Sequence, residues 1–166
     1  MGEVAIVKKK KRPIKTICFG LVLLASSTFF IALAAYKDGV DEYWEGDYEK
    51  ALSKLSQEAE DGDAKAHRYL GHLFYNGKGV TKDLEVAFSH YLESASMGDS
   101  ISQNQVGVMY EEGKGTSQDL DEAHFWYRWS AEGGSSSAQF NLGLFYKHGK
   151  GSVGVDFEKA AKWFER

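Results

Sequence analysis

Three Gly-Lys-Gly triplets are the first candidates for chemistry, because glycine backbones beside a lysine can cradle a phosphate. They occupy residues 77–79, 113–115 and 149–151. Thr116 follows the second copy, but the spacing G-x-x-x-x-G-K-[ST] of a phosphate-binding loop is absent. Each triplet also follows a predicted helix rather than a strand. We therefore interpret all three as tight turns that need a positive φ.

Histidine side chains could bind a metal ion. The chain has five of them, His67, His72, His90, His124 and His148. No two stand at the i, i+4 spacing of a helical zinc site, and the single cysteine is Cys18. His90 holds the position that Trp126 and Trp163 hold further along the chain, so we interpret it as an interhelix packing residue. The sequence predicts no metal ligand and no cofactor.

Nucleophilic and acid–base catalysis are also weakly supported. Residues 135–137 are three serines, but neither G-x-S-x-G nor a strand–elbow–helix context surrounds them. The acidic neighbours are Glu111 with Glu112, and Asp119 with Asp121 and Glu122. These carboxylates coincide with predicted helix ends and first turns, where the helix dipole and capping favour them. We predict no catalytic residue.

A step of 36 residues positions these candidates, since it relates Gly71, Gly107 and Gly143 and also the three Gly-Lys-Gly triplets. A fixed period of this length indicates stacked supersecondary units. Apolar residues at helical spacing lie on both sides of each triplet. We therefore predict an all-α fold, a right-handed α-solenoid of helix-turn-helix repeats with negligible sheet.

The period also sets the predicted units. A cap helix pair is expected at 38–62, followed by repeats at 63–98, 99–134 and 135–166, the last of them truncated. A dense aromatic set falls in the later second helices: Trp126, Tyr127, Trp129, Trp163 and Phe164. At helical spacing such a set indicates core more often than a ligand box, although Trp129 falls off the stripe.

These residues carry a family resemblance. The pattern L-G-x-x-[YF]-x-x-G-x-G, then Asp, A-x-x-[HW]-Y and A-x-x-G, resembles the Sel-one-like repeat, a relative of the tetratricopeptide repeat, over about residues 38–166. Phe74 in place of tyrosine and one extra residue within 152–155 depart from it. The resemblance implies an adaptor that presents a curved helical surface to proteins. A cysteine-rich subgroup is linked to β-lactam binding, but this chain lacks the disulfides of that subgroup.

Charge and hydropathy divide the chain. Residues 1–15 carry a net charge of +5, residues 16–36 carry none, and the remainder carries −9. Twenty-one uncharged residues make a helix of about 31 Å, one hydrocarbon thickness. The basic flank predicts a cytoplasmic N-terminus and a repeat domain outside the cytoplasm. The alternative is a signal peptide cleaved near Ala34.

One face of the first helices is the predicted binding surface. By resemblance to tetratricopeptide arrays it lines the concave side. Its nine positions are Arg68, His72, Tyr75, Asn104, Val108, Glu111, Phe140, Leu144 and Lys147. Val108, Phe140 and Leu144 are apolar where a solvated face should be polar, which suggests a contact patch. The alternative is that they pack against the neighbouring repeat.

We therefore predict a non-catalytic protein–protein interaction scaffold held outside the cytoplasm on a single membrane anchor. The acidic repeat domain argues against nucleic acid and favours a basic protein partner. No small-molecule substrate is expected. A periplasmic immunity protein that neutralises a secreted toxin is one alternative, and a β-lactamase-like cell-envelope hydrolase is another. Trp163 and Phe164 predict a C-terminal edge that is frayed or covered by a partner or a second copy.

Overall fold

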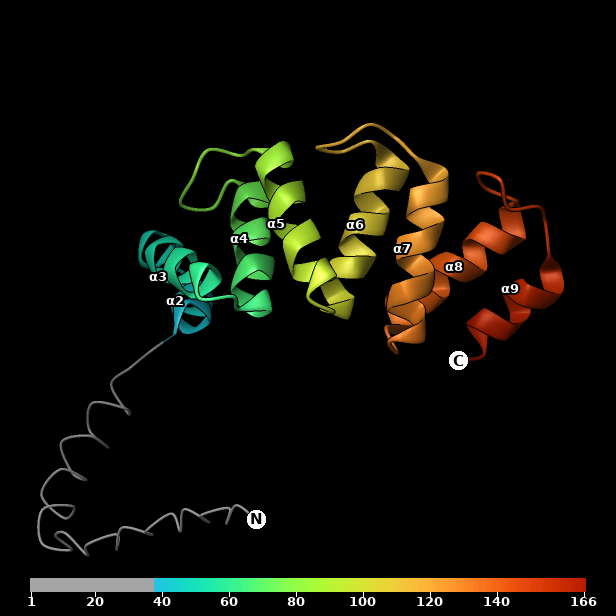
Figure 1. Cartoon of the computed structure of the whole chain (residues 1–166), viewed down its shortest axis with the longest axis horizontal. Coiled ribbons are helices and arrows are strands. Elements are labelled where there is room, and N and C mark those ends of the chain that lie inside the picture. Colours follow the sequence, from blue (N-terminus) through green and yellow to red (C-terminus); the bar gives the residue numbers. More distant parts are fainter. Residues whose placement is uncertain (1–37) are drawn as a thin grey trace, which may run out of the picture. The chain divides into compact units, whose positions relative to one another are not determined.

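Figure 1 shows helices alone between residues 38 and 166, the part of the chain that the computed structural model describes. They are α2 (Gly39–Glu45), α3 (Tyr48–Glu60), α4 (Ala64–Asn76), α5 (Leu84–Ser96), α6 (Ser100–Glu112), α7 (Leu120–Glu132), α8 (Ser136–His148) and α9 (Phe157–Phe164). Residues 38–166 contain no strand. The predicted all-α solenoid is confirmed for this part of the chain.

The predictions for the N-terminus lie outside the described residues. They are the basic tail at 1–15, the transmembrane helix at 16–36 and the alternative cleavage near Ala34. Within 38–166, no helix is long and apolar enough to cross a membrane. The membrane anchor stays a prediction.

Local capping explains where the helices begin and end. A short polar side chain accepts a first-turn backbone N–H at the start of each described helix, namely Asp38, Asp47, Asp63, Asp83, Asp99, Asp119, Ser135 and Asp156. Left-handed glycines end α2, α4, α6 and α8 at Gly46, Gly77, Gly113 and Gly149. Such caps satisfy backbone groups that a helix leaves open at its ends.

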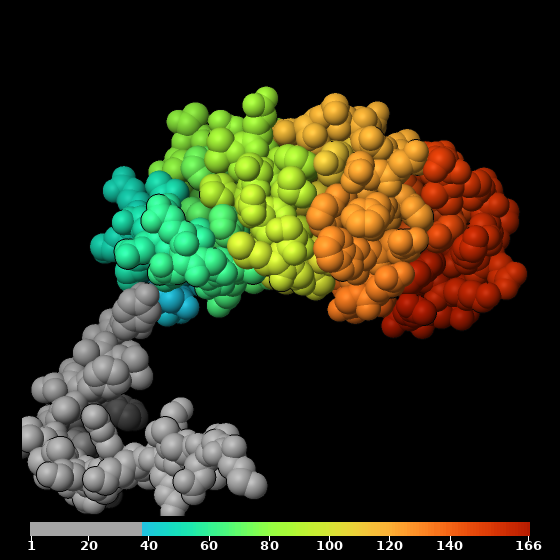
Figure 2. All heavy atoms as spheres, viewed as in Figure 1, coloured from blue at the N-terminus to red at the C-terminus, as the bar shows by residue number. Residues whose placement is uncertain are grey.

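The helices pack in chain order. Within a repeat α4 packs on α5, α6 on α7 and α8 on α9, and the stack continues through α5 with α6 and α7 with α8. Figure 2 shows the side chains of successive repeats touching along the domain. A glycine in each first helix permits the close approach within a repeat. A Cβ at Gly107 would lie 2.7 Å from the Tyr127 ring.

The buried core joins neighbouring units rather than filling each one separately. One cluster combines Ala87, Tyr91 and Ala95 of α5 with Val106 and Met109 of α6, and another combines residues of α7 and α8. Because every helix pair shares its core with the next, the repeats stabilise one another.

The predicted aromatic core is partly wrong. Trp126 and Tyr127 are buried, and Trp163 packs half-buried against the α7–α8 cluster. In contrast, 41% of Trp129 and 44% of Phe164 is exposed. Trp129 lies off the buried stripe of α7. One face of the Phe164 ring packs on Gly143 of α8. The rest of the ring is exposed, because among the described helices α9 packs mainly on α8.

Candidate interaction surface

In the first repeat, the predicted binding residues make contacts that hold the fold together. Arg68 Nη1 forms an ion pair of 2.8 Å with Asp99 Oδ2, and Asp99 caps α6 of the next repeat. His72 Nδ1 lies 3.1 Å from the Tyr91 hydroxyl. The Tyr75 ring meets the Tyr91 ring edge-on. These three side chains are half-buried and join α4 to α5 and α6.

His72 makes this region sensitive to acid. Burial lowers the pKa of His72 below its ordinary value of 6.5, and the charges of Arg68 and Lys78 lower it further. Burial likewise lowers the pKa of His90 and of His124. In the folded chain these imidazoles therefore remain neutral to a lower pH than in the unfolded chain.

Acidification should consequently destabilise the domain. A histidine with a lowered folded pKa binds fewer protons when folded, so stability is full above a pH of about 6.5 and falls below it. Each such histidine lowers the free energy of unfolding by at most about 1.4 kcal/mol for each pH unit of acidification. His72→Leu, the residue found at position 144 of repeat three, should reduce this slope in urea melts between pH values of about 7 and 5. An unchanged slope would contradict the assignment.

In the second repeat, the predicted residues contact the second helix of their own repeat or the first helix of the third. Asn104 Oδ1 accepts a hydrogen bond of 3.0 Å from Asn141 Nδ2. Val108 packs against the α7–α8 cluster. Glu111 accepts a hydrogen bond of 2.8 Å from the Tyr127 hydroxyl. Burial and then this hydrogen bond raise the pKa of Tyr127, so the phenol stays protonated and remains a donor.

In the third repeat, the predicted residues are the most open. Phe140 is 57% exposed and its ring lies 5.6 Å from that of Phe164, Lys147 is exposed, and Leu144 is half-buried. The structure thus places the nine residues on three successive first helices, α4, α6 and α8, with most of them in contact with a neighbouring helix. Their role in binding a partner stays a prediction.

The loop lysines have a role that the sequence analysis missed. Lys78 of the first Gly-Lys-Gly triplet reaches back to the cap, where its Nζ lies 3.4 Å from the Tyr43 hydroxyl and 5.1 Å from the centre of the Tyr48 ring. Hydrogen bonds to Tyr48 and Tyr43 raise the pKa of Lys78. The lysine is therefore engaged with the preceding unit rather than held free for a phosphate.

The same link recurs in the later triplets. Lys114 forms an ion pair with Glu112 of its own repeat and a hydrogen bond with Tyr75 of the preceding repeat. These two hydrogen-bonded contacts raise the pKa of Lys114. Lys150 forms an ion pair with Glu111 of the preceding repeat. The lysines recur with the period of the sequence, but the residues of the preceding unit that they contact depend on how the units stack, which the period alone does not give.

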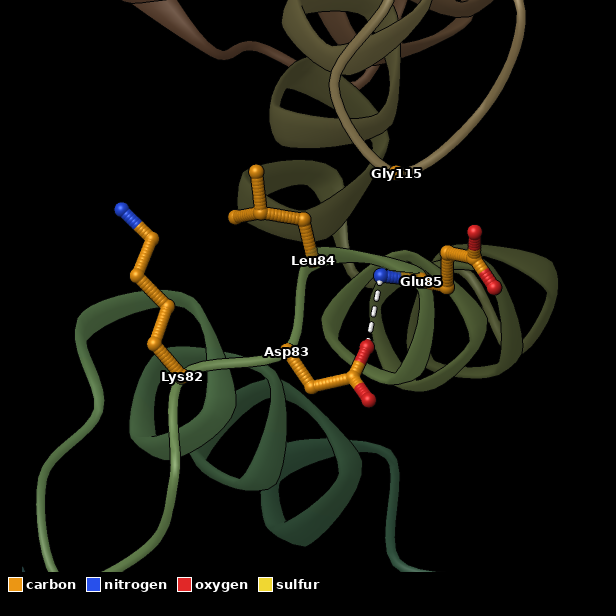
Figure 3. Close-up of a pocket in the computed structure, with 5 residues that line it drawn as sticks. All are labelled: Lys82, Asp83, Leu84, Glu85 and Gly115. Carbon is orange, nitrogen blue, oxygen red and sulfur yellow. Dashed lines mark hydrogen bonds between the residues drawn. The ribbon is translucent and has the colours of Figure 1, made fainter.

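Short acidic and hydroxyl side chains at the helix starts serve as caps. Asp83 Oδ1 accepts hydrogen bonds of 3.0 Å from the backbone N–H groups of Glu85 and Val86. Figure 3 shows this contact with Glu85 in a hollow that the Gly115 loop borders, with the Lys82 side chain extending away from the carboxylate. Asp119 caps α7 and Ser135 caps α8 in the same way.

An exposed aromatic patch on α7, formed by Phe125 and Trp129, has no counterpart in the first repeat. Phe125 is 44% exposed, and the two side chains line a hollow of about 240 Å³ with Arg128 and Glu132. Trp129 stacks on the buried Trp126 with ring centres 5.3 Å apart. The equivalent positions in α5, one repeat earlier, are Ser89 and Glu93. Comparison of the repeats in register could have identified this patch.

The fold and these surfaces define a helical-repeat protein built from paired antiparallel helices. The Sel1 repeat matches residues 64–99, 100–135 and 136–166. The chain therefore belongs to the Sel1 repeat family, which confirms the resemblance seen in the sequence.

Solved structures agree with this assignment. A Sel1 repeat protein from Oxalobacter formigenes is 31% identical with a TM-score of 0.73, over 76% of this chain and 52% of that one. A protective antigen with an SLR fold, present in uropathogenic Escherichia coli strains, is 33% identical with a TM-score of 0.70, over 75% and 28%. Helicobacter pylori cysteine rich protein B is 28% identical with a TM-score of 0.52, over 54% and 67%.

The matched region is thus about half of the Oxalobacter protein and a smaller share of the Escherichia coli antigen. Comparison with curated proteins gave no match. The similarity therefore establishes the repeat fold, which is consistent with binding to other proteins.

Proposed function

We propose that the chain is a non-catalytic scaffold that binds another protein through the exposed aromatic patch on α7. The observation that carries this proposal is the exposure of Phe125 and Trp129 at positions where the first repeat has serine and glutamate. Tryptophan and arginine are enriched among residues that dominate binding energy at protein interfaces. The hollow at this patch is lined by a tryptophan, Trp129, and an arginine, Arg128, together with Phe125 and Glu132.

Charge defines the chemistry of the proposed partner. The chain after residue 36 has a net charge of −9, which favours association with a basic protein surface. The partner should present an apolar side chain to Trp129 and basic groups around it. Phe140 and Lys147, the most exposed members of the predicted first-helix face, supply a second contact in this proposal.

The proposed location is outside the cytoplasm, on a membrane anchor at residues 16–36. The support is the sequence: an uncharged apolar stretch preceded by a basic tail and followed by an acidic domain. This placement would expose the repeat domain to envelope proteins.

Photocrosslinking in intact cells tests the binding proposal. A photoreactive residue at position 128 of the full chain should give one discrete crosslinked protein, identifiable by mass spectrometry. The double substitution Phe125→Ser and Trp129→Glu introduces the residues of the first repeat. It should reduce the yield of the crosslinked product about tenfold, because the two aromatic side chains that contact the partner are lost. Circular dichroism should show the variant folded.

A photoreactive residue at position 93 provides the matched control, because Glu93 of α5 is exposed and stands one repeat before Trp129. It should not give the same product. Equal yields from positions 93 and 128, or a yield that the double substitution leaves unchanged, would contradict the proposed surface.

A further inference from the structure

Two histidines from facing helices meet in the first repeat. His67 of α4 and His90 of α5 are 23 residues apart in sequence, yet their Nδ1 atoms lie 3.2 Å apart. Both rings are half-buried, and the His90 ring stacks on Phe74 with centres 5.7 Å apart and planes at 15°. The pair is therefore held in position by packing on the His90 side.

Both histidines depart from the repeat at the place where they meet. The later repeats have Gln103 and Gln139 at the position of His67. These glutamines donate hydrogen bonds of 3.1 and 3.3 Å to the Ala95 and Ala131 carbonyl oxygens. The later repeats have Trp126 and Trp163 at the position of His90. Because glutamine and tryptophan already serve the packing at these positions, the paired histidines call for a separate explanation.

The surroundings of the pair suit a cation. His67 and His90 line a pocket of about 310 Å³ together with Glu60, whose carboxylate supplies negative charge. Imidazole nitrogens are the commonest metal ligands in proteins.

We propose that His67 and His90 form a binding site for a divalent transition metal ion such as Cu²⁺ or Zn²⁺. Two nitrogens bound at about 2.0–2.1 Å stand about 3.3 Å apart on a tetrahedral ion such as Zn²⁺ and about 2.9 Å apart at adjacent positions of a square-planar ion such as Cu²⁺. The separation of 3.2 Å between the two Nδ1 atoms lies between these values. In the metal-free neutral pair one ring donates an Nδ1–H to the Nδ1 atom of the other. On metal binding the proton of the donor ring moves to Nε2, so both rings are then Nε2–H tautomers and the N–H···N hydrogen bond is exchanged for two metal bonds.

The protein supplies two ligands in this site. Within residues 38–166, no group of three His, Cys, Asp or Glu side chains is arranged to hold a metal ion. The remaining coordination positions are therefore taken by water or by a side chain of another molecule that reaches the pocket. Imidazole ligands suit both copper and zinc, and copper binds more tightly at a given site. The site is independent of the aromatic patch on α7 and of the function proposed for it.

Calorimetric titration of the full chain in detergent with Cu²⁺ tests this site, with the chain itself providing the variants. His67→Gln and His90→Trp introduce the residues of the later repeats and should preserve the fold. Each should weaken the copper affinity at least tenfold. His148→Gln alters an exposed histidine outside the pair and should leave the affinity unchanged. The nitrogen coupling in the electron paramagnetic resonance spectrum should indicate two imidazoles in the unmodified chain and one in His67→Gln.

Two results would overturn the proposal. One is copper binding that is equally tight in the unmodified chain and in a folded His67→Gln variant, which would locate the metal elsewhere. The other is absence of binding by the unmodified chain at millimolar copper, which would leave the pair as a hydrogen bond alone. Thermal denaturation provides a second readout, because copper should raise the melting temperature of the unmodified chain and not that of His67→Gln.

Discussion

Replacing Gly115 by alanine should lower the free energy of unfolding by about 2–4 kcal/mol. Gly115 has a φ of +71°, in the left-handed region. An added Cβ there would overlap the Leu84 carbonyl oxygen and the backbone at the start of α5. Backbone atoms at a helix start cannot move aside as a flexible side chain can. Urea denaturation followed by circular dichroism measures the loss.

Gly98→Ala is the matched control for this prediction. Gly98 has a φ of +94°, but an added Cβ would have no atom within 4 Å. Its substitution should cost only the backbone strain, about 1–2 kcal/mol. If both alanine variants lost the same stability, the contact between the Gly115 loop and α5 would contribute nothing.

Gly115 also shows how far the sequence predicts this fold. The period identified the Gly-Lys-Gly triplets as turns, and aspartates and glycines marked the helix ends, because both signals are local. The contact between Gly115 and Leu84 spans 31 residues and depends on how one repeat sits on the previous one. The same limit applies to Lys150 and Glu111, whose ion pair joins successive repeats.

The candidate surfaces were predictable to different degrees. Register alone distinguishes Phe125 and Trp129 from Ser89 and Glu93, so the aromatic patch could have been found. His67 and His90 are different, because a 23-residue separation matches no metal-binding spacing within a helix. Their proximity follows from the antiparallel packing of α4 on α5, which brings the first half of α4 beside the middle of α5.

Replacing Tyr127 by alanine should cost about 3–5 kcal/mol, the range for removing a buried aromatic ring. Tyr127 is 1% exposed and fills the space beside Gly107, and its ring lies 5.5 Å from that of Phe145 in the next repeat. Tyr127→Phe keeps the ring and loses the hydroxyl that donates to Glu111. That variant should cost about 1.5–3 kcal/mol, as expected for one hydrogen bond to a charged group.

The alanine variant should also change how the domain unfolds. In a repeat array, stability is approximately the sum of the repeats and of the interfaces between neighbours. Tyr127 belongs to α7, in the middle repeat, and contributes both to the packing within that repeat and to its interface with the next. Its removal should uncouple the first repeat from the third and split a single denaturation transition into two. Tryptophan fluorescence, dominated by α7 and α9 through Trp126, Trp129 and Trp163, should then change before the far-ultraviolet circular dichroism of the whole domain. Coincident transitions in the alanine variant would show that the interface formed by Tyr127 does not couple the repeats.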